Sequence, residues 1–216
     1  MRTRKTQGKK KKTGRPLSRR GDGGLPAKLL AATEEILREQ GLHKFTLREA
    51  ARRAGVSHGA PAFHFGDVSG LLTAFAAEGY DGMTALMLKY RAEAPKDAMA
   101  QLVAVGCAYV DYAIAHRPQF QLMFRSDVIH LDDKRYCETS ERTFAQLQET
   151  MAPYLPAGAS EAEQMAKLML AWSAVHGFAT LYLEKGFHPF YGDDPKPPVS
   201  ADAKRMLELL NASFLR

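Results

Sequence analysis

Groups that could bind phosphate or hydrogen-bond to nucleic-acid bases are concentrated between residues 46 and 64. Thr46 and Ser57 carry hydroxyls, Arg48 a guanidinium, and His58 and His64 imidazoles. Hydroxyls at helix starts bring backbone amides near a helix N-terminus, where a phosphate is favoured. An imidazole can donate or accept a hydrogen bond at a base edge, or it can contact a phosphate. These residues are candidates for contacts to nucleic acid.

The elements that must position these groups are two short helices joined by Gly55-Val56-Ser57. Thr46 and Glu49 have the spacing of a capping box at the start of the first helix. Gly55 permits a tight left-handed exit from it, and Ser57 is expected to cap the second helix. A helix-turn-helix of this kind presents the N-terminal end of its second helix to the major groove. The same pattern would also fit an ordinary helical hairpin inside a core.

Residues 26–72 resemble the N-terminal domain of the TetR (tetracycline repressor) family of transcription regulators. One branch of that family carries "VSHAAPYRHF" at its recognition helix, and this chain has "VSHGAPAFHF" at residues 56–65. The resemblance implies binding to a double-stranded DNA operator. The residues expected to contact DNA are Thr46, Arg48, Ser57, His58, Gly59, Ala60, Phe63 and His64.

Pro61 lies inside the recognition helix that the resemblance implies. If Ser57 is the N-cap, Pro61 lies about one turn in and removes a single amide bond near the helix start. We infer a short, stiff helix with small residues beside the bases. The family usually has an aromatic residue where this chain has Ala62, and a lysine where it has Val68. Two lost phosphate contacts would weaken binding and its salt dependence.

The first 24 residues form a basic segment, with ten Lys and Arg residues against one acid, Asp22. They supply all of the positive excess in a chain whose net charge is +6. A segment this polar is expected to be a disordered cationic arm that attracts phosphate. Lys12 and Arg15, in the sequence KTGRP, resemble a minor-groove hook. The alternative is a solvated tail that only aids solubility.

The rest of the chain is predicted to be helical, without a convincing strand or an internal repeat. We expect an all-α protein with a helix-turn-helix domain at residues 25–72 and a ligand-sensing and dimerisation domain at residues 73–216. Asp67 is expected to cap a long helix to about Tyr90, and residues 97–116 are apolar on nearly every face, as in a buried helix. Further helices are expected at 118–124, at 132–152, from Ser160 to about residue 185 and from Ser200 to Phe214.

The C-terminal half carries a second family signal. Trp172-Ser173-Ala174-Val175-His176-Gly177 resembles the Trp-x3-His-Gly signature of one group of TetR-type regulatory domains, and residues 116–124 are also typical of that group. Residues 165–183 have apolar side chains on two opposite faces. One face can pack on the body of the protein, and the other on the same helix of a second subunit in a two-fold homodimer. The family also binds palindromes as homodimers.

A pocket for a small apolar or aromatic effector is expected in this domain, as in the family. Methionine and aromatic side chains suit adaptable apolar pockets, although at helical spacing they are more often plain core. His176 can equally be a hydrogen-bonded interior histidine. The candidate lining residues are Tyr80, Met83, Met87, Cys107, Tyr112, Phe120, Phe144, Trp172 and His176.

Other classes of protein find little support in the sequence. The seven histidines form no metal-ligand or catalytic spacing, and the two cysteines suggest reduced thiols. We therefore expect a cytoplasmic protein that is not an enzyme, without a metal, cofactor or membrane span. The preferred function is a homodimeric, ligand-responsive transcriptional regulator, and the resemblance favours a repressor. The alternative is a dimeric small-molecule-binding or adaptor protein with weakened DNA recognition.

Overall fold

The structure is a computed structural model that describes residues 24–185 and 204–209. All regular elements in these ranges are helical, which confirms the expected all-α class. Residues 204–209 form a further helical segment. The elements are α1 (Leu25–Gln40), η1 (Leu42–Lys44), α2 (Leu47–Ala54), α3 (Ala60–Phe65), α4 (Val68–Glu93), α5 (Ala98–Ala115), α6 (Arg117–Met123), α7 (Lys134–Met151), η2 (Ala152–Tyr154) and α8 (Glu161–Leu183).

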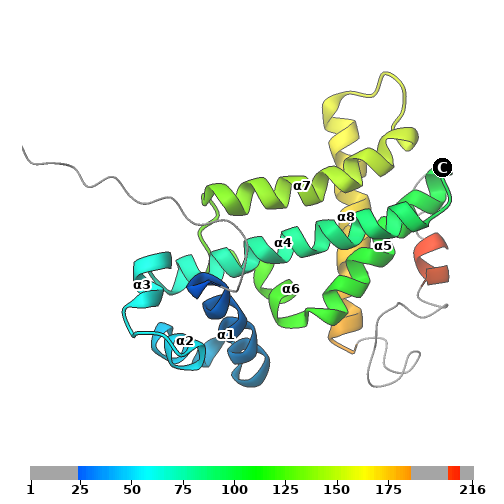
Figure 1. Cartoon of the computed structure of the whole chain (residues 1–216). Coiled ribbons are helices and arrows are strands. Elements are labelled where there is room, and N and C mark those ends of the chain that lie inside the picture. The colour runs from blue at the N-terminus through cyan, green and yellow to red at the C-terminus, as the bar shows by residue number, and fades with distance from the viewer. Residues whose placement is uncertain (1–23, 186–203, 210–216) are drawn as a thin grey trace, which may run out of the picture.

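Helices α1–α3 form a small unit at one end of α4 (Figure 1). Leu29 and Ile36 of α1 are fully buried, and Phe45 anchors the connection that follows η1. Ala50 of α2 is also fully buried, because a small side chain lets α2 lie close to α1. Gly55 ends α2 in the left-handed conformation, at φ 65° and ψ 34°, as the sequence predicts.

The recognition helix begins later than the sequence suggests. Ser57 does not cap it. The Ser57 carbonyl instead accepts a bond from the amide of Ala60 at 3.0 Å, and α3 starts at Ala60 with Gly59 in the cap position. Pro61 is therefore the second helical residue, where no intrahelical donor is needed, so it removes no helical bond. The prediction that Pro61 lies one turn inside the helix was wrong for this reason.

The link between α3 and α4 is short and tight. The Asp67 side chain caps α4 by accepting from the amide of Gly70 at 2.8 Å, as predicted. Gly66 turns the chain with φ 82°. A Cβ at Gly70 would overlap the carbonyl oxygen of Phe65, so only glycine fits there. Helix α4 then continues without a break past the expected domain boundary at residue 72.

The larger unit is built around α4, which packs against α5, α6 and α7, while α8 packs across α5 and α7 (Figure 1). Helix α5 is long and apolar enough to cross a membrane, but 61% of it is buried inside the protein, so it is a core helix here. Helix α8 begins after Ser160, as expected, and Ser160 and Glu163 bond reciprocally in a capping box. The basic arm with Lys12 and Arg15, and the cap at Ser200, lie outside the described residues.

Candidate functional site

The residues expected to contact DNA gather on one exposed surface of α2 and α3. Thr46, Arg48 and Ser57 are exposed, as are His58 and Gly59 in the turn that precedes α3. On α3 itself His64 is exposed, and Phe63 is 85% exposed. The two helices thus bring together groups from both ends of the 46–64 segment. Lys12 and Arg15 lie outside the described residues.

Ala60 differs from the other candidates because it is buried. Its side chain and that of Pro61 pack inward, and Val56 and Phe65 pack against the core on either side. These four residues fix α3 to the body of the unit. The Ala60 side chain is therefore an anchor and is not available to a base. The residues that remain on the outer side of the turn and helix are Ser57, His58, Gly59, Ala62, Phe63 and His64.

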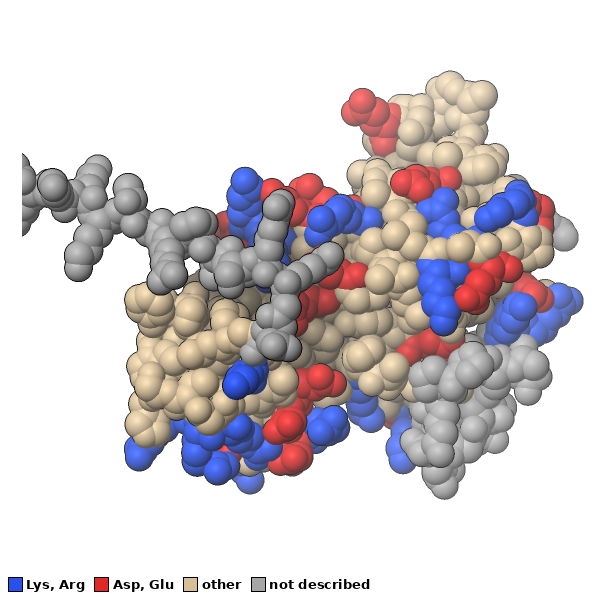
Figure 2. Space-filling view, in the orientation of Figure 1, with Lys and Arg blue, Asp and Glu red and all other residues tan. Residues whose placement is uncertain are grey.

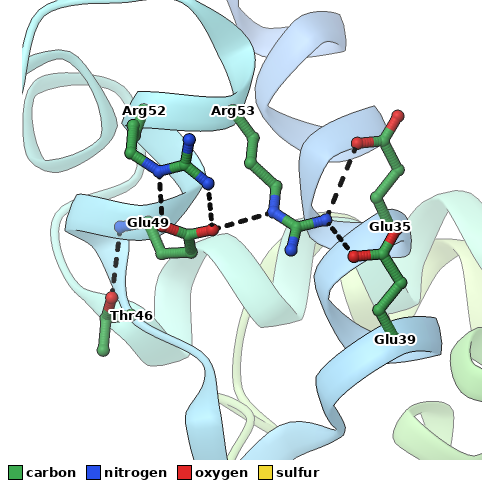
Figure 3. A network of polar contacts seen from close by, with 6 residues as sticks. All are labelled: Glu35, Glu39, Thr46, Glu49, Arg52 and Arg53. Atoms are coloured by element: carbon green, nitrogen blue, oxygen red, sulfur yellow. Dashed lines mark hydrogen bonds and ion pairs between the residues drawn. The ribbon is translucent and has the colours of Figure 1, made fainter.

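An ion-pair network fixes α2 against α1 (Figure 3). The Arg53 guanidinium, only 14% exposed, bonds to Glu49 at 2.9 Å and to Glu39 at 2.6 Å, with Glu35 at 4.0 Å. Arg52 bonds to both carboxylate oxygens of Glu49, at 2.8 and 2.7 Å. Hydrogen bonds from Arg52 and then Arg53 lower the pKa of Glu49 to about 2. Glu49 is therefore a fixed negative charge at neutral pH.

This network corrects half of the predicted capping box. The Thr46 hydroxyl does accept from the amide of Glu49, at 3.1 Å. The Glu49 carboxylate does not return to Thr46, because two guanidinium groups compete for it and charge-assisted bonds are stronger than a bond to a neutral amide (Figure 3). The sequence reasoning treated neither Arg52 nor Arg53 as part of the site.

Positive charge lies beside the recognition helix and not on it. Figure 2 shows an uncharged surface over α3, with Lys and Arg side chains gathered over the neighbouring α1 and α2. Exposed cations in this unit are Lys28, Arg38, Lys44, Arg48 and Arg52. Arg48 forms no ion pair within residues 24–185 and 204–209, so its guanidinium is available to a phosphate. This arrangement offers cations to a DNA backbone beside a neutral surface on α3.

An apolar cavity of about 380 Å³ lies inside the larger unit, between α4, α5, α7 and α8. Its volume falls in the range of about 300–1,000 Å³ that ligand pockets occupy. Five of the nine predicted lining residues do line it. They are Tyr80, Met83, Met87, Phe144 and Trp172.

The other four predicted residues lie elsewhere. Cys107 faces the opposite side of α5, where burial raises the pKa of its thiol to about 11. The Tyr112 hydroxyl donates to Gln119 at 2.8 Å, in the packing of α5 on α6. Phe120 and His176 line a second, more open cleft between α1, α6 and the end of α8, with a volume of about 810 Å³. Helical spacing could not say which side of each helix faces the cavity.

Sequence reasoning also missed several residues that line the cavity. Tyr109 and Phe124 add aromatic rings, and Thr143 adds a hydroxyl that donates to the Tyr80 carbonyl at 3.1 Å. Further lining residues are Leu102, Val105, Gly106, Ser140, Glu141, Leu147, Met165, Met169, Ala171, Val175 and Leu207. Most of these have the same apolar character as the predicted set, so no sequence signal separated them from core residues.

Side chains that could bind a metal ion do not come together in the part of the chain that the structure describes. No group of three or more His, Cys, Asp or Glu side chains within residues 24–185 and 204–209 is placed to hold a metal ion. The most buried histidine contact, from His176 to Tyr109, involves aromatic and not acidic partners. What the described residues offer is an exposed surface on α2 and α3 and an apolar cavity in the larger unit.

Comparison with known proteins identifies the same two units. Residues 29–75 match the family model described as bacterial regulatory proteins, tetR family, and residues 102–211 match the one described as tetracyclin repressor-like, C-terminal domain. The HTH-type transcriptional regulator BetI of Burkholderia thailandensis is 33% identical over 134 residues, which cover 60% of this chain and 69% of that protein. These matches do not test the Trp-x3-His-Gly subgroup, which stays a prediction.

Solved structures share the fold over most of the chain. A protein of unknown function from Rhodococcus sp. RHA1 has a TM-score of 0.68 and 29% sequence identity, covering 90% of this chain and 95% of that one. The TetR family regulator PfmR from Thermus thermophilus has a TM-score of 0.58 and 15% identity, covering 87% and 97%. The second likeness concerns the fold alone. From the two family matches and the BetI relative, the chain belongs to the TetR family and is a DNA-binding transcriptional regulator.

Proposed function

We propose that this regulator is a ligand-responsive repressor that binds a palindromic operator as a homodimer in the cytoplasm. TetR family regulators bind DNA operators and act as dimers. The observation that carries the proposal is the exposed surface of α2 and α3, held in place by the buried anchors Ala60 and Pro61. Its partner is DNA, and an enzymatic role is not part of the proposal.

The residues proposed to contact DNA fall into two groups. Arg48 and the helix-capping Thr46 lie on α2 and its cap, where they would hold the phosphate backbone. Ser57, His58, Gly59, Phe63 and His64 lie at α3 and in the turn before it, where they would face base edges. Lys12 and Arg15 of the basic segment are proposed as additional minor-groove contacts.

The homodimer is proposed to form through α8 and the C-terminal segment. Leu170 and Leu181 are 48% and 50% exposed on α8, and they lie on one face with Ala174 and Gly177. A Cβ added to Gly177 would meet nothing within 4 Å in the protomer, so that position has room for a partner helix. A two-fold axis through this face would place two α3 helices on successive turns of the duplex.

The effector is proposed to be a small apolar or aromatic molecule that binds in the cavity. The lining is mainly aliphatic and aromatic, with Thr143, Ser140 and Glu141 as polar groups that could orient a ligand. The cavity involves α4, which also carries α3 at its start, so a ligand that changes the position of α4 would change the position of α3. Occupancy would then shift the dimer between two shapes of different operator affinity.

The experiment that tests this function is selection of bound DNA from random duplexes with the full chain, followed by footprinting of the enriched sequence. We expect an enriched inverted repeat whose half-sites are about one helical turn apart, protected by a dimer. Addition of the effector should release it. Recovery of unenriched DNA at every salt concentration would contradict sequence-specific regulation and favour the adaptor alternative.

A further inference from the structure

Phe63 is the most exposed large apolar side chain among the described residues. It is 85% exposed, whereas the next aromatic residue of the same helix, Phe65, packs against the core. The Phe63 ring makes a T-shaped contact to the imidazole of its neighbour His64, at 5.2 Å between centroids. A phenyl ring left in water contributes no burial free energy to folding. The stability of the fold therefore gives no reason for a phenylalanine at this position.

The ring is directed to the end of α3 that a helix-turn-helix presents to DNA. Side chains on a helix lean toward its N-terminus, over the preceding turn. The preceding turn at Phe63 holds Gly59, whose carbonyl accepts from the Phe63 amide at 3.0 Å. Gly59 is exposed and has no side chain that could cover the ring. Phe63 thus projects where base edges would lie.

Helix α3 and the turn before it carry no Lys or Arg side chain. The sequence contains neither Lys nor Arg between Ala54 and Leu88, a stretch that includes the whole of α3. The commonest specific contact in the major groove, an Arg or Lys bonded to guanine, is therefore not available to this helix. The groove displays one apolar group, the C5 methyl of thymine. An exposed phenyl ring is complementary to that group.

We propose that Phe63 reads a thymine methyl group in the major groove, and that each operator half-site carries a thymine at the position facing it. This inference rests on the proposed function, since it names the base feature that α3 recognises. The neighbouring imidazoles of His58 and His64 then supply the hydrogen bonds that fix the register of α3 beside that base pair. The contact buries the ring against the methyl group and displaces water from both.

The direct test replaces thymines of the selected operator by deoxyuridine, one at a time, with the full-length chain as the binder. Deoxyuridine lacks only the C5 methyl group and keeps the Watson–Crick pairing. At one position in each half-site we expect the affinity to fall about fourfold, the value for one buried methyl group, and about fifteenfold when both half-sites carry it. Deoxyuridine at thymines that Phe63 does not face is the matched DNA control.

Variants of the protein then assign the effect to Phe63. In Phe63→Ala the thymine and deoxyuridine operators should bind equally, while Phe63→Leu should keep part of the preference because it remains apolar. The variant Arg48→Gln is the control, since loss of a phosphate contact should weaken both operators alike and keep their ratio. Because Phe63 is exposed, Phe63→Ala and Phe63→Leu should leave the unfolding temperature unchanged.

Two results would overturn the proposed contact between Phe63 and a thymine methyl group while leaving DNA recognition intact. Either deoxyuridine has no effect at any position of an operator that the protein binds, or the deoxyuridine effect persists in Phe63→Ala. A failure of the proposed function looks different, because the selection itself would then enrich no sequence, and the thymine reading would fall with it. Binding to the selected operator before any substitution therefore separates the two failures.

Discussion

The Tyr109 hydroxyl lies 2.7 Å from Nδ1 of His176 and joins the wall of the cavity to the neighbouring cleft. The indole N–H of Trp172 also reaches this hydroxyl, at 3.4 Å. An indole can only donate, so the hydroxyl accepts from Trp172, and its own proton remains available for a bond to Nδ1. Where the hydroxyl donates to Nδ1, His176 is neutral and carries its ring proton on Nε2. The aromatic rings of Phe120 and Phe124 surround the imidazole.

The first prediction concerns the pH dependence that follows from the burial of His176. Burial lowers the pKa of His176 below its ordinary value of 6.5, so the unfolded chain binds a proton more readily than the folded one. The free energy of unfolding therefore rises with pH. The contribution of neutral His176 is complete above about pH 7 and is lost as the pH falls below the pKa of this histidine in the unfolded chain. Chemical denaturation between about pH 5 and 8 should show a smaller decline toward low pH for His176→Gln than for the unchanged chain. Parallel curves for the two proteins would show that folding does not lower the pKa of His176.

The sequence could predict most helices because their start signals are local. Asp67 and Ser160 occupy the cap positions that their neighbours indicated, and Gly55 has the left-handed conformation expected after α2. Ser57 failed as a cap because serine carries the same signal in a turn as at a helix start, and only the backbone geometry distinguishes them. The Glu49 carboxylate was misassigned because Arg52 and Arg53, three and four residues further along the same helix, bond to it, and the sequence reasoning considered neither.

The second prediction tests the tight link between α3 and α4. Gly70→Ala should destabilise the chain by about 2 kcal/mol and weaken operator binding, because the added methyl would overlap the Phe65 carbonyl and displace α3. Gly106→Ala is the matched control, since Gly106 also lies inside a helix but its added methyl would make only ordinary contacts, at 3.9 Å to Val175 and 4.0 Å to Leu207. Thermal unfolding and operator titration measure the two effects. An unchanged unfolding temperature in Gly70→Ala would show that the link is not constrained as described.

The third prediction separates a DNA-binding arginine from a structural one. Arg48→Gln should weaken binding to all sequences and reduce the slope of log affinity against log salt by about one, as for a single lost phosphate contact. Its unfolding temperature should not change, because Arg48 is exposed. Arg53→Gln should instead lower the unfolding temperature, since it leaves Glu39 and Glu49 without a shared cation between α1 and α2. A salt slope altered only by Arg53→Gln would reverse the two assignments.

The fourth prediction addresses the cavity through its volume. Ala171→Phe adds a ring to the lining, so it should abolish or strongly reduce release of the operator by an effector and leave operator affinity without effector unchanged. Ala166→Phe is the matched control, because Ala166 is an exposed residue of the same helix that does not line the cavity. Equal effector response in the two variants would place the effector elsewhere, and the cleft beside His176 would be the next site to test.

The cavity was predictable in character but not in outline. Trp172 and Phe144 lie where the pattern of large side chains suggested, and so does Met83. Cys107 and Tyr109 lie two residues apart on α5, but Tyr109 lines the cavity whereas Cys107 faces another cleft. On a helix that is apolar on nearly every face, periodicity cannot assign the direction of each side chain. That information arises only when α4, α7 and α8 are packed around α5.

The last prediction concerns the second apolar face of α8. Leu170 and Leu181 are about half exposed in the protomer, and the face between them carries only the small residues Ala174 and Gly177. If this face meets the same face of a second subunit, the double change Leu170→Glu and Leu181→Glu places like charges on both sides of the two-fold axis. The charges repel each other, so we expect the dimer to separate into monomers. Analytical ultracentrifugation at micromolar concentration measures this change. The monomer should retain its helical circular dichroism, because neither side chain belongs to the buried core, and it should lose operator affinity because two linked half-site contacts become independent. Leu88→Glu changes a leucine of similar exposure on α4 and should leave the dimer intact. A double variant that still sediments as a dimer would exclude this face and direct attention to other surfaces of the larger unit.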